Sequence, residues 1–119
     1  MLDFCSKFSH NAYFGGYPSK DEFYALIHDL QIEYFIDFTT LKERKNLSYN
    51  YEFDLVNFHN KKYLNFCILD NKIPTCTSSF LRLVSYVSDK IKNGASVYLH
   101  CKGGHGRSTL FVACVLIYI

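Results

Sequence analysis

A nine-residue stretch, His100 to Ser108, carries the residue types from which a phosphate site can be built. It reads HCKGGHGRS, and the five residues between Cys101 and Arg107 include the glycines Gly103, Gly104 and Gly106. Glycines let successive backbone amides point into one concavity, and such a nest favours negative charge. By its residues alone, the stretch is open to three interpretations: a flexible turn, a metal site or a phosphate-binding loop.

Cysteine and arginine at this spacing have complementary chemistry. A thiol at the mouth of an anion nest has its pKa lowered below ~8.5 and becomes a nucleophile at neutral pH. The planar guanidinium of Arg107 matches two phosphate oxygens better than a lysine does. Ser108 can donate its hydroxyl to the cysteine sulfur and steady it as a leaving group. Lys102 and His105 add positive charge inside the loop, and substrate contact and simple solvent exposure explain them equally well.

The metal interpretation lacks a ligand. His100, Cys101 and His105 could each bind zinc, but a fourth ligand at suitable spacing is missing. His100 is better suited to hydrogen-bonding the backbone and orienting the loop. We therefore expect a site without a metal or another cofactor.

The segments around this stretch alternate between strands and helices. Solid apolar runs predict strands over residues 12–16, 34–38, 63–69 and 95–99. Helical spacing and a capping box predict a helix of about 11 residues after Ser19. Two further helices are predicted, one over residues 77–92 and one from Gly106 to the end of the chain. Residues 46–62 show no clear period and are expected to be irregular, with room for one short edge strand. Apolar runs of this kind indicate an α/β fold whose central, mostly parallel sheet is flanked by helices on both faces.

Functional sites in such sheets lie at the carboxyl ends of the strands. Both Asp70, at the end of the predicted strand 63–69, and the stretch 100–108 are expected there. The chain has 119 residues, of which 49% are hydrophobic, and this suits a single domain over residues 1–119.

The pattern HC-x5-R-S between a strand and a helix resembles the signature loop of the cysteine-based protein tyrosine phosphatases. From Phe14-Gly15-Gly16 to the final helix, the order and spacing of elements resemble the dual-specificity group of that superfamily. The resemblance implies that Cys101 is the nucleophile and that Arg107 and the loop amides hold the phosphate. It also implies that Asp70, which precedes Cys101 by 31 positions, is the general acid. The implied phosphate-binding set is Lys102, Gly103, Gly104, His105, Gly106 and Arg107.

The resemblance implies hydrolysis of phosphotyrosine, and of phosphoserine or phosphothreonine, through a phosphocysteine intermediate. The family usually has glycine where this chain has Thr109, and it usually continues for one or two helices beyond Ile119. The chain is therefore short at its C-terminus for this fold, and we expect an exposed apolar patch along residues 107–119.

Two other functions remain open. Lys102 and His105 make the loop basic, which would suit a phosphoinositide or an RNA 5′ end. The chain could also be a phosphate-binding module that no longer turns substrate over. Beyond an RNA substrate we expect no nucleic-acid partner, because a net charge of +2 is too small for general binding of nucleic acid.

The remaining expectations concern the setting of the protein. The longest apolar stretch, residues 110–119, is half the ~20 residues that span a bilayer. An odd number of cysteines and the absence of a basic-then-apolar leader favour an intracellular protein, in the cytoplasm or nucleus. The resemblance implies that its partner is a phosphorylated protein, and we expect a monomer. Asp37 is expected to be structural, Glu43 to lie in a solvated run, and Cys67 to be a buried core thiol.

Overall fold

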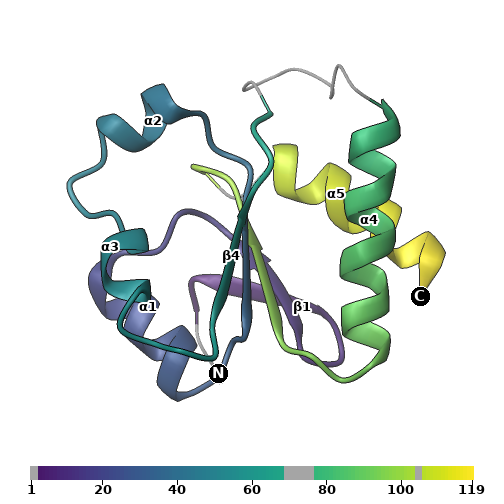
Figure 1. The fold of residues 1–119 in the computed structure, drawn as a ribbon, viewed down its shortest axis with the longest axis horizontal. Coiled ribbons are helices and arrows are strands. Elements are labelled where there is room, and N and C mark those ends of the chain that lie inside the picture. Colours follow the sequence, from purple (N-terminus) through teal and green to yellow (C-terminus); the bar gives the residue numbers. More distant parts are fainter. Residues whose placement is uncertain (1–2, 69–76, 104–105) are drawn as a thin grey trace.

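The computed structural model describes residues 3–68, 77–103 and 106–119 (Figure 1). Within these residues one five-stranded sheet has the order β1-β2-β5-β3-β4. The strands are β1 (Cys5–Ser9), β2 (Ala12–Gly15), β3 (Tyr34–Asp37), β4 (Lys62–Asn65) and β5 (Val97–His100). All neighbouring strands are parallel except β1 and β2, which form an antiparallel pair.

Helices cover both faces of the sheet, as Figure 1 shows. They are α1 (Lys20–His28), α2 (Leu41–Lys45), α3 (Glu52–Leu55), α4 (Thr77–Lys92) and α5 (Gly106–Tyr118). Along β5, Val97 and Leu99 point into the apolar cluster beneath α4 and α5, whereas Tyr98 points into the cluster beneath α1 and α3. A strand with an apolar cluster on each face has apolar residues at successive positions, which explains the apolar run in the sequence. The predicted α/β architecture is confirmed.

Two capping boxes fix where helices begin at one end of the sheet. The Ser19 hydroxyl accepts a hydrogen bond from the Glu22 amide, and the Glu22 carboxylate accepts one from the Ser19 amide. Thr40 and Glu43 repeat this arrangement at the start of α2. Each box satisfies backbone amides that a helix N-terminus otherwise leaves unpaired. The box at Ser19 was predicted from sequence, and α1, with nine residues, is slightly shorter than expected.

Four expectations are corrected. Residues 5–9, for which no element was predicted, form β1. Residues 46–62, expected to be irregular, contain α3 and the start of β4. The strand expected over 63–69 ends at Asn65, and it is a half-exposed edge strand because it pairs only with β3, which itself ends at Asp37. Cys67, beyond that strand end, is exposed and is not a core thiol.

The last helix, α5, presents both a buried and an exposed apolar surface. Its buried residues are Arg107, Ser108, Phe111, Val112 and Val115. On its outer side Leu116 is 50% exposed and Ile117 is 83% exposed, which confirms the expected apolar patch. In the described part of the chain no helix has the length and apolar character needed to span a membrane.

Candidate active site

The site lies at the carboxyl edge of the sheet, where three parallel strands end side by side. Gly15 of β2 and Asp37 of β3 are both register partners of His100 at the end of β5. Beyond the strands, the Phe38 amide donates to the His100 carbonyl oxygen (2.9 Å) and the Tyr17 amide donates to the Lys102 carbonyl oxygen (3.1 Å). The segment that leaves β5 is therefore held from both neighbouring strands.

The predicted site residues divide into buried, exposed and undescribed groups. Cys101, directly after β5, is 2% exposed, and Arg107 and Ser108 in the first turn of α5 are 4% and 0% exposed. Lys102, Gly103 and Gly106 are exposed. Gly104 and His105, and the predicted general acid Asp70, lie outside the residues that the structure describes. The predicted nucleophile Cys101 and the predicted phosphate-binding Arg107 are thus both buried, one before and one after the loop.

Arg107 is held in a fixed orientation by two segments distant in sequence. Its Nη1 donates to Glu43 Oε1 at 2.7 Å and its Nη2 donates to Glu43 Oε2 at 2.9 Å, which makes the pair bidentate. Nη1 also donates to the Ile68 carbonyl oxygen at 2.9 Å. A planar guanidinium bound in this way has little rotational freedom, so α2 and the segment after β4 together set its direction.

Glu43 is the residue that sequence analysis missed. It was expected in a solvated run, but its carboxylate accepts hydrogen bonds from Arg107 and from the amide of Thr40. The Arg107 hydrogen bonds, foremost among several causes, lower the pKa of this carboxyl to about 2. The capping box Thr40-x-x-Glu43 was the available sequence signal, because it fixes the carboxylate at the helix start. Nothing local in the sequence names its partner.

His100 lies wholly buried behind the loop, with its ring enclosed by aromatic side chains. Its Nε2 is hydrogen-bonded to the Tyr51 hydroxyl at 2.6 Å, and the Tyr17 ring packs edge-on against it at 4.9 Å. Burial lowers the pKa of His100 and raises that of Tyr51 well above its ordinary value. The two side chains therefore meet as neutral groups. The buried Asp37 carboxylate lies 3.8 Å from the other ring nitrogen, Nδ1.

Asp37 ties the end of β3 to the elements around it. Its carboxylate accepts hydrogen bonds from the Thr39 amide (2.8 Å), the Thr39 hydroxyl (2.6 Å) and the Tyr63 hydroxyl (2.6 Å). Arg44 Nη1 lies 4.0 Å from the same carboxylate and donates to the Thr39 carbonyl oxygen. These contacts agree with the structural role expected of Asp37. They fix the start of α2, from which Glu43 reaches Arg107.

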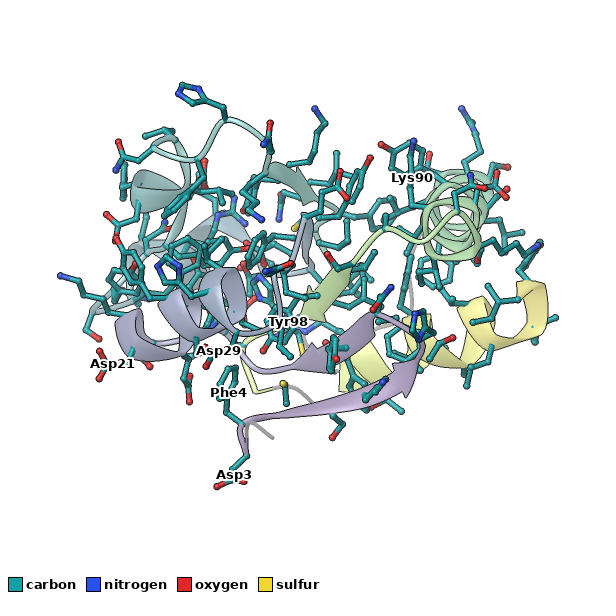
Figure 2. All side chains as sticks on the ribbon, turned by 90° about the horizontal axis from the view of Figure 1, so that it is seen from below. Asp3, Phe4, Asp21, Asp29, Lys90 and Tyr98 are labelled. Atoms are coloured by element: carbon teal, nitrogen blue, oxygen red, sulfur yellow. The ribbon has the colours of Figure 1, made fainter. Side chains whose placement is uncertain are left out.

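The Gly15-Gly16 turn supports the loop from the β2 side. The Tyr98 hydroxyl donates to the Gly16 carbonyl oxygen at 2.6 Å. A Cβ atom on Gly16 would lie 3.1 Å from the Lys102 carbonyl oxygen, and one on Gly15 would lie 2.6 Å from the Tyr98 hydroxyl oxygen. Figure 2 shows Tyr98 deep among packed side chains, with Phe4 close to it. A side chain at Gly16 would therefore require the loop to shift slightly, and one at Gly15 would collide with Tyr98 of β5.

Gly15→Ala is expected to destabilise the fold by about 1–3 kcal/mol, the usual cost of overpacking a tight site. The added methyl group would meet the Tyr98 hydroxyl oxygen at 2.6 Å and the Phe4 carbonyl oxygen at 2.9 Å. Urea unfolding measures the change in the free energy of unfolding. Gly106→Ala is the control, because a Cβ atom there meets nothing within 4 Å. Equal stability of the two variants would contradict the close approach.

Comparison with known proteins identifies the family. The sequence pattern of a family described as "polymorphic toxin system, DSP-PTPase phosphatase" matches residues 11–119. The chain belongs to this family. The DSP-PTPase fold agrees with solved structures: the crystal structure of Tk-PTP in the active form superimposes with a TM-score of 0.80 at 20% identity, covering 99% of this chain and 75% of that one.

Two viral proteins extend the DSP-PTPase relationship at the sequence level. The chain is 32% identical over 108 residues to "Putative tyrosine phosphatase 197R" of Invertebrate iridescent virus 6, covering 88% of this chain and 38% of that protein. It is 35% identical over 111 residues to "Putative tyrosine phosphatase 067L" of Invertebrate iridescent virus 3, covering 88% of this chain and 42% of that protein. The chain therefore spans about two fifths of the length of these relatives.

Proposed function

We propose that the chain hydrolyses phosphorylated protein side chains, phosphotyrosine first and phosphoserine or phosphothreonine as well, with Cys101 as nucleophile. The observation that carries the proposal is the bidentate clamp of Glu43 on Arg107, in the first turn of the helix that follows the Cys101 loop. A fixed guanidinium at a helix N-terminus, next to a buried thiol, is an arrangement that favours a phosphoryl group. The family assignment supports the same chemistry.

In the proposed first step, the Cys101 thiolate attacks phosphorus in line, and the bond between phosphorus and the ester oxygen breaks. Asp70 gives its proton to the departing phenol or alcohol oxygen. Arg107 and the loop amides stabilise the charge on the equatorial oxygens, and the dipole of α5 favours the thiolate. The product of this step is a phosphocysteine and the dephosphorylated side chain.

In the proposed second step, water attacks the phosphocysteine while Asp70, now a carboxylate, accepts a proton from it. The bond between phosphorus and sulfur breaks, inorganic phosphate leaves, and Ser108 stabilises the returning thiolate. The guanidinium and the amides supply the positive charge that a metal provides in other phosphoryl transfers, so the scheme needs no cofactor. The proposed setting is intracellular, with the chain acting as a monomer.

The test compares wild type with Cys101→Ser on a small aryl phosphate and on a phosphotyrosine peptide. We expect wild type to hydrolyse both and to form a phosphocysteine that rapid acid quenching and mass spectrometry detect, whereas Cys101→Ser falls to background. If neither protein hydrolyses phosphate esters and both bind phosphopeptide equally, the chain is a binding module. Faster turnover of a phosphoinositide or a 5′-triphosphorylated RNA than of phosphopeptide would contradict the proposed substrate.

Asp70→Ala is expected to slow hydrolysis of esters with poor leaving groups far more than that of esters with good ones. A phenol of low pKa departs without a proton, whereas a tyrosine phenol needs one from the general acid. The measurement is kcat/KM, which reports the step in which the leaving group departs, for a series of aryl phosphates that differ in leaving-group pKa. If the variant's rate depended on leaving-group pKa with the same slope as the wild-type rate, the general acid would be another residue.

A further inference from the structure

A hollow that is separate from the candidate active-site residues lies against α2. Its volume is about 710 Å³, within the range of ligand pockets. All the residues that line it lie between positions 41 and 54. Figure 1 shows the two helices of this segment, α2 and α3, one above the other. The side chains that define its walls are Leu41, Arg44 and Lys45 from α2, and Glu52, Phe53 and Asp54 from α3. The mechanism uses none of these six residues.

The hollow is attached to the phosphate site through α2. Glu43 binds Arg107 from this helix, and its neighbours Arg44 and Lys45 line the hollow. A second link runs through Tyr17, whose hydroxyl donates to Asn50 in the hollow (2.8 Å) and whose ring packs against His100. Leu41 and Lys45, which line the hollow, stand two positions before and after Glu43 and so lie on the opposite side of α2. Because an α-helix with its side chains is about 10–12 Å across, we take about that width as the separation of the hollow from the guanidinium.

The lining is both apolar and balanced in charge. Leu41 is 58% exposed and Phe53 is 77% exposed, so two large apolar side chains of the lining keep more than half of their surface in contact with solvent. The charged side chains are two basic residues on the α2 wall and the two acidic residues Glu52 and Asp54 on the α3 wall. A polyanion such as RNA or a phosphoinositide would gain no net attraction here. An uncharged or mixed-charge polypeptide with an apolar side chain fits both features.

We propose that this hollow binds the polypeptide that carries the phosphorylated residue, and that it selects an apolar side chain three to four positions from that residue. An extended chain advances about 3.3 Å per residue, so three to four residues cover the width of α2. The apolar side chain packs between Leu41 and Phe53. The proposal rests on the proposed function, because it takes Arg107 as the anchor of the phosphate.

The experiment uses Phe53→Ala with Val56→Ala as matched control. Val56 is 76% exposed, follows directly after α3 and does not line the hollow. The substrates are phosphotyrosine peptides with leucine, or glycine in its place, three or four residues from the phosphotyrosine, and a small aryl phosphate. We expect Phe53→Ala to lower kcat/KM for the leucine peptides roughly tenfold, as loss of an apolar anchor does. The glycine peptides and the aryl phosphate should stay within about twofold, and Val56→Ala should change nothing.

The outcomes separate this proposal from the one it rests on. If the aryl phosphate is hydrolysed but Phe53→Ala treats leucine and glycine peptides as wild type does, the hollow is not a peptide site, although the phosphatase proposal stands. An effect of Phe53→Ala on phosphoinositide vesicles instead of on peptides would overturn the peptide in favour of a lipid. If no ester is hydrolysed, the proposed function fails. The role of the hollow is then tested by comparing the affinity of Cys101→Ser for the leucine peptide with that of the double variant Cys101→Ser, Phe53→Ala. Equal affinities would overturn the proposal that the hollow binds a peptide.

Discussion

Arg107→Lys is expected to lower kcat/KM for an aryl phosphate by about 10²–10³-fold, the loss typical when one donor to a developing oxyanion is removed. The ammonium of lysine donates from a single nitrogen, so it cannot reproduce the parallel pairing in which two guanidinium nitrogens bind the two Glu43 oxygens. Its ammonium would also lack a second nitrogen for a second phosphate oxygen. Steady-state kinetics with a small aryl phosphate measure the loss, because such a substrate makes few contacts beyond the phosphate.

The control for this variant is Arg82→Lys on α4. Arg82 is exposed, so exchanging its guanidinium for an ammonium should leave kcat/KM within about twofold of wild type. Because charge is conserved in both variants, a difference between them reports the geometry of the guanidinium and not the net charge. If Arg107→Lys hydrolysed the ester at the wild-type rate, the phosphate would be held by other groups.

Glu43→Gln is expected to destabilise the fold by about 3 kcal/mol, the lower part of the range for removing one partner of a buried ion pair. The lower part applies because the Glu43 side chain keeps 18% of its surface exposed, whereas Arg107 keeps 4%. The amide can still accept one hydrogen bond, but it removes the negative charge that the guanidinium binds through two hydrogen bonds. Since Glu43 binds Arg107, we assign it a positioning role. We therefore also expect kcat for the aryl phosphate to fall.

The chain offers a close control for Glu43→Gln. Glu22 occupies the same third helical position in a capping box, formed with Ser19, but it has no arginine partner among the described residues. Glu22→Gln should change the free energy of unfolding by no more than about 0.5 kcal/mol. Urea unfolding of the two variants separates the Arg107 pair from the cap. Equal losses would show that the cap, and not the ion pair, carries the effect.

Acid provides an independent test of the same pair. The folded-state pKa of Glu43 is lowered from 4.5 to about 2, with the Arg107 hydrogen bonds as the largest cause. A carboxyl whose pKa is lowered by folding contributes stability that is complete above its unfolded pKa and is lost as the pH falls through its folded pKa. As the pH falls from 4.5 to 2, wild type should therefore lose the stability that the Glu43 carboxylate contributes, which Glu43→Gln lacks at every pH. The free energies of unfolding of the two proteins should converge over this range. Parallel curves over this window would contradict the pKa assignment.

Local order along the chain was predictable because it depends on neighbours in sequence. Apolar runs and helical spacing place β3, β5, α1 and α4 close to where they lie, and the capping box at Ser19 acts within four residues. The fold of the signature stretch, a buried strand end followed by a helix from Gly106, is set in the same way. The resemblance to the phosphatase superfamily rests on this segment, and the family assignment confirms it.

The pairings across the molecule were not predictable from local patterns. The clamp on Arg107 joins residues 64 positions apart, and the His100 to Tyr51 bond joins residues 49 apart. A glutamate in the charged run LKERK looks solvated until the sheet places α2 at the same edge as α5. The half-exposed edge position of β4 and the antiparallel pairing of β1 likewise follow from which strands become neighbours.

The sequence by itself determined the chemical inventory of the site, the α/β order and the family, because residue types, spacing and local hydrogen bonds are properties of short segments. Only the tertiary structure decided what holds Arg107, what surrounds His100 and which residues of α2 and α3 line one hollow. The physical reason is that β3 and β5 are parallel and share one carboxyl edge. That edge brings α2, the Gly15-Gly16 turn and the Cys101 loop together, although no local pattern links them.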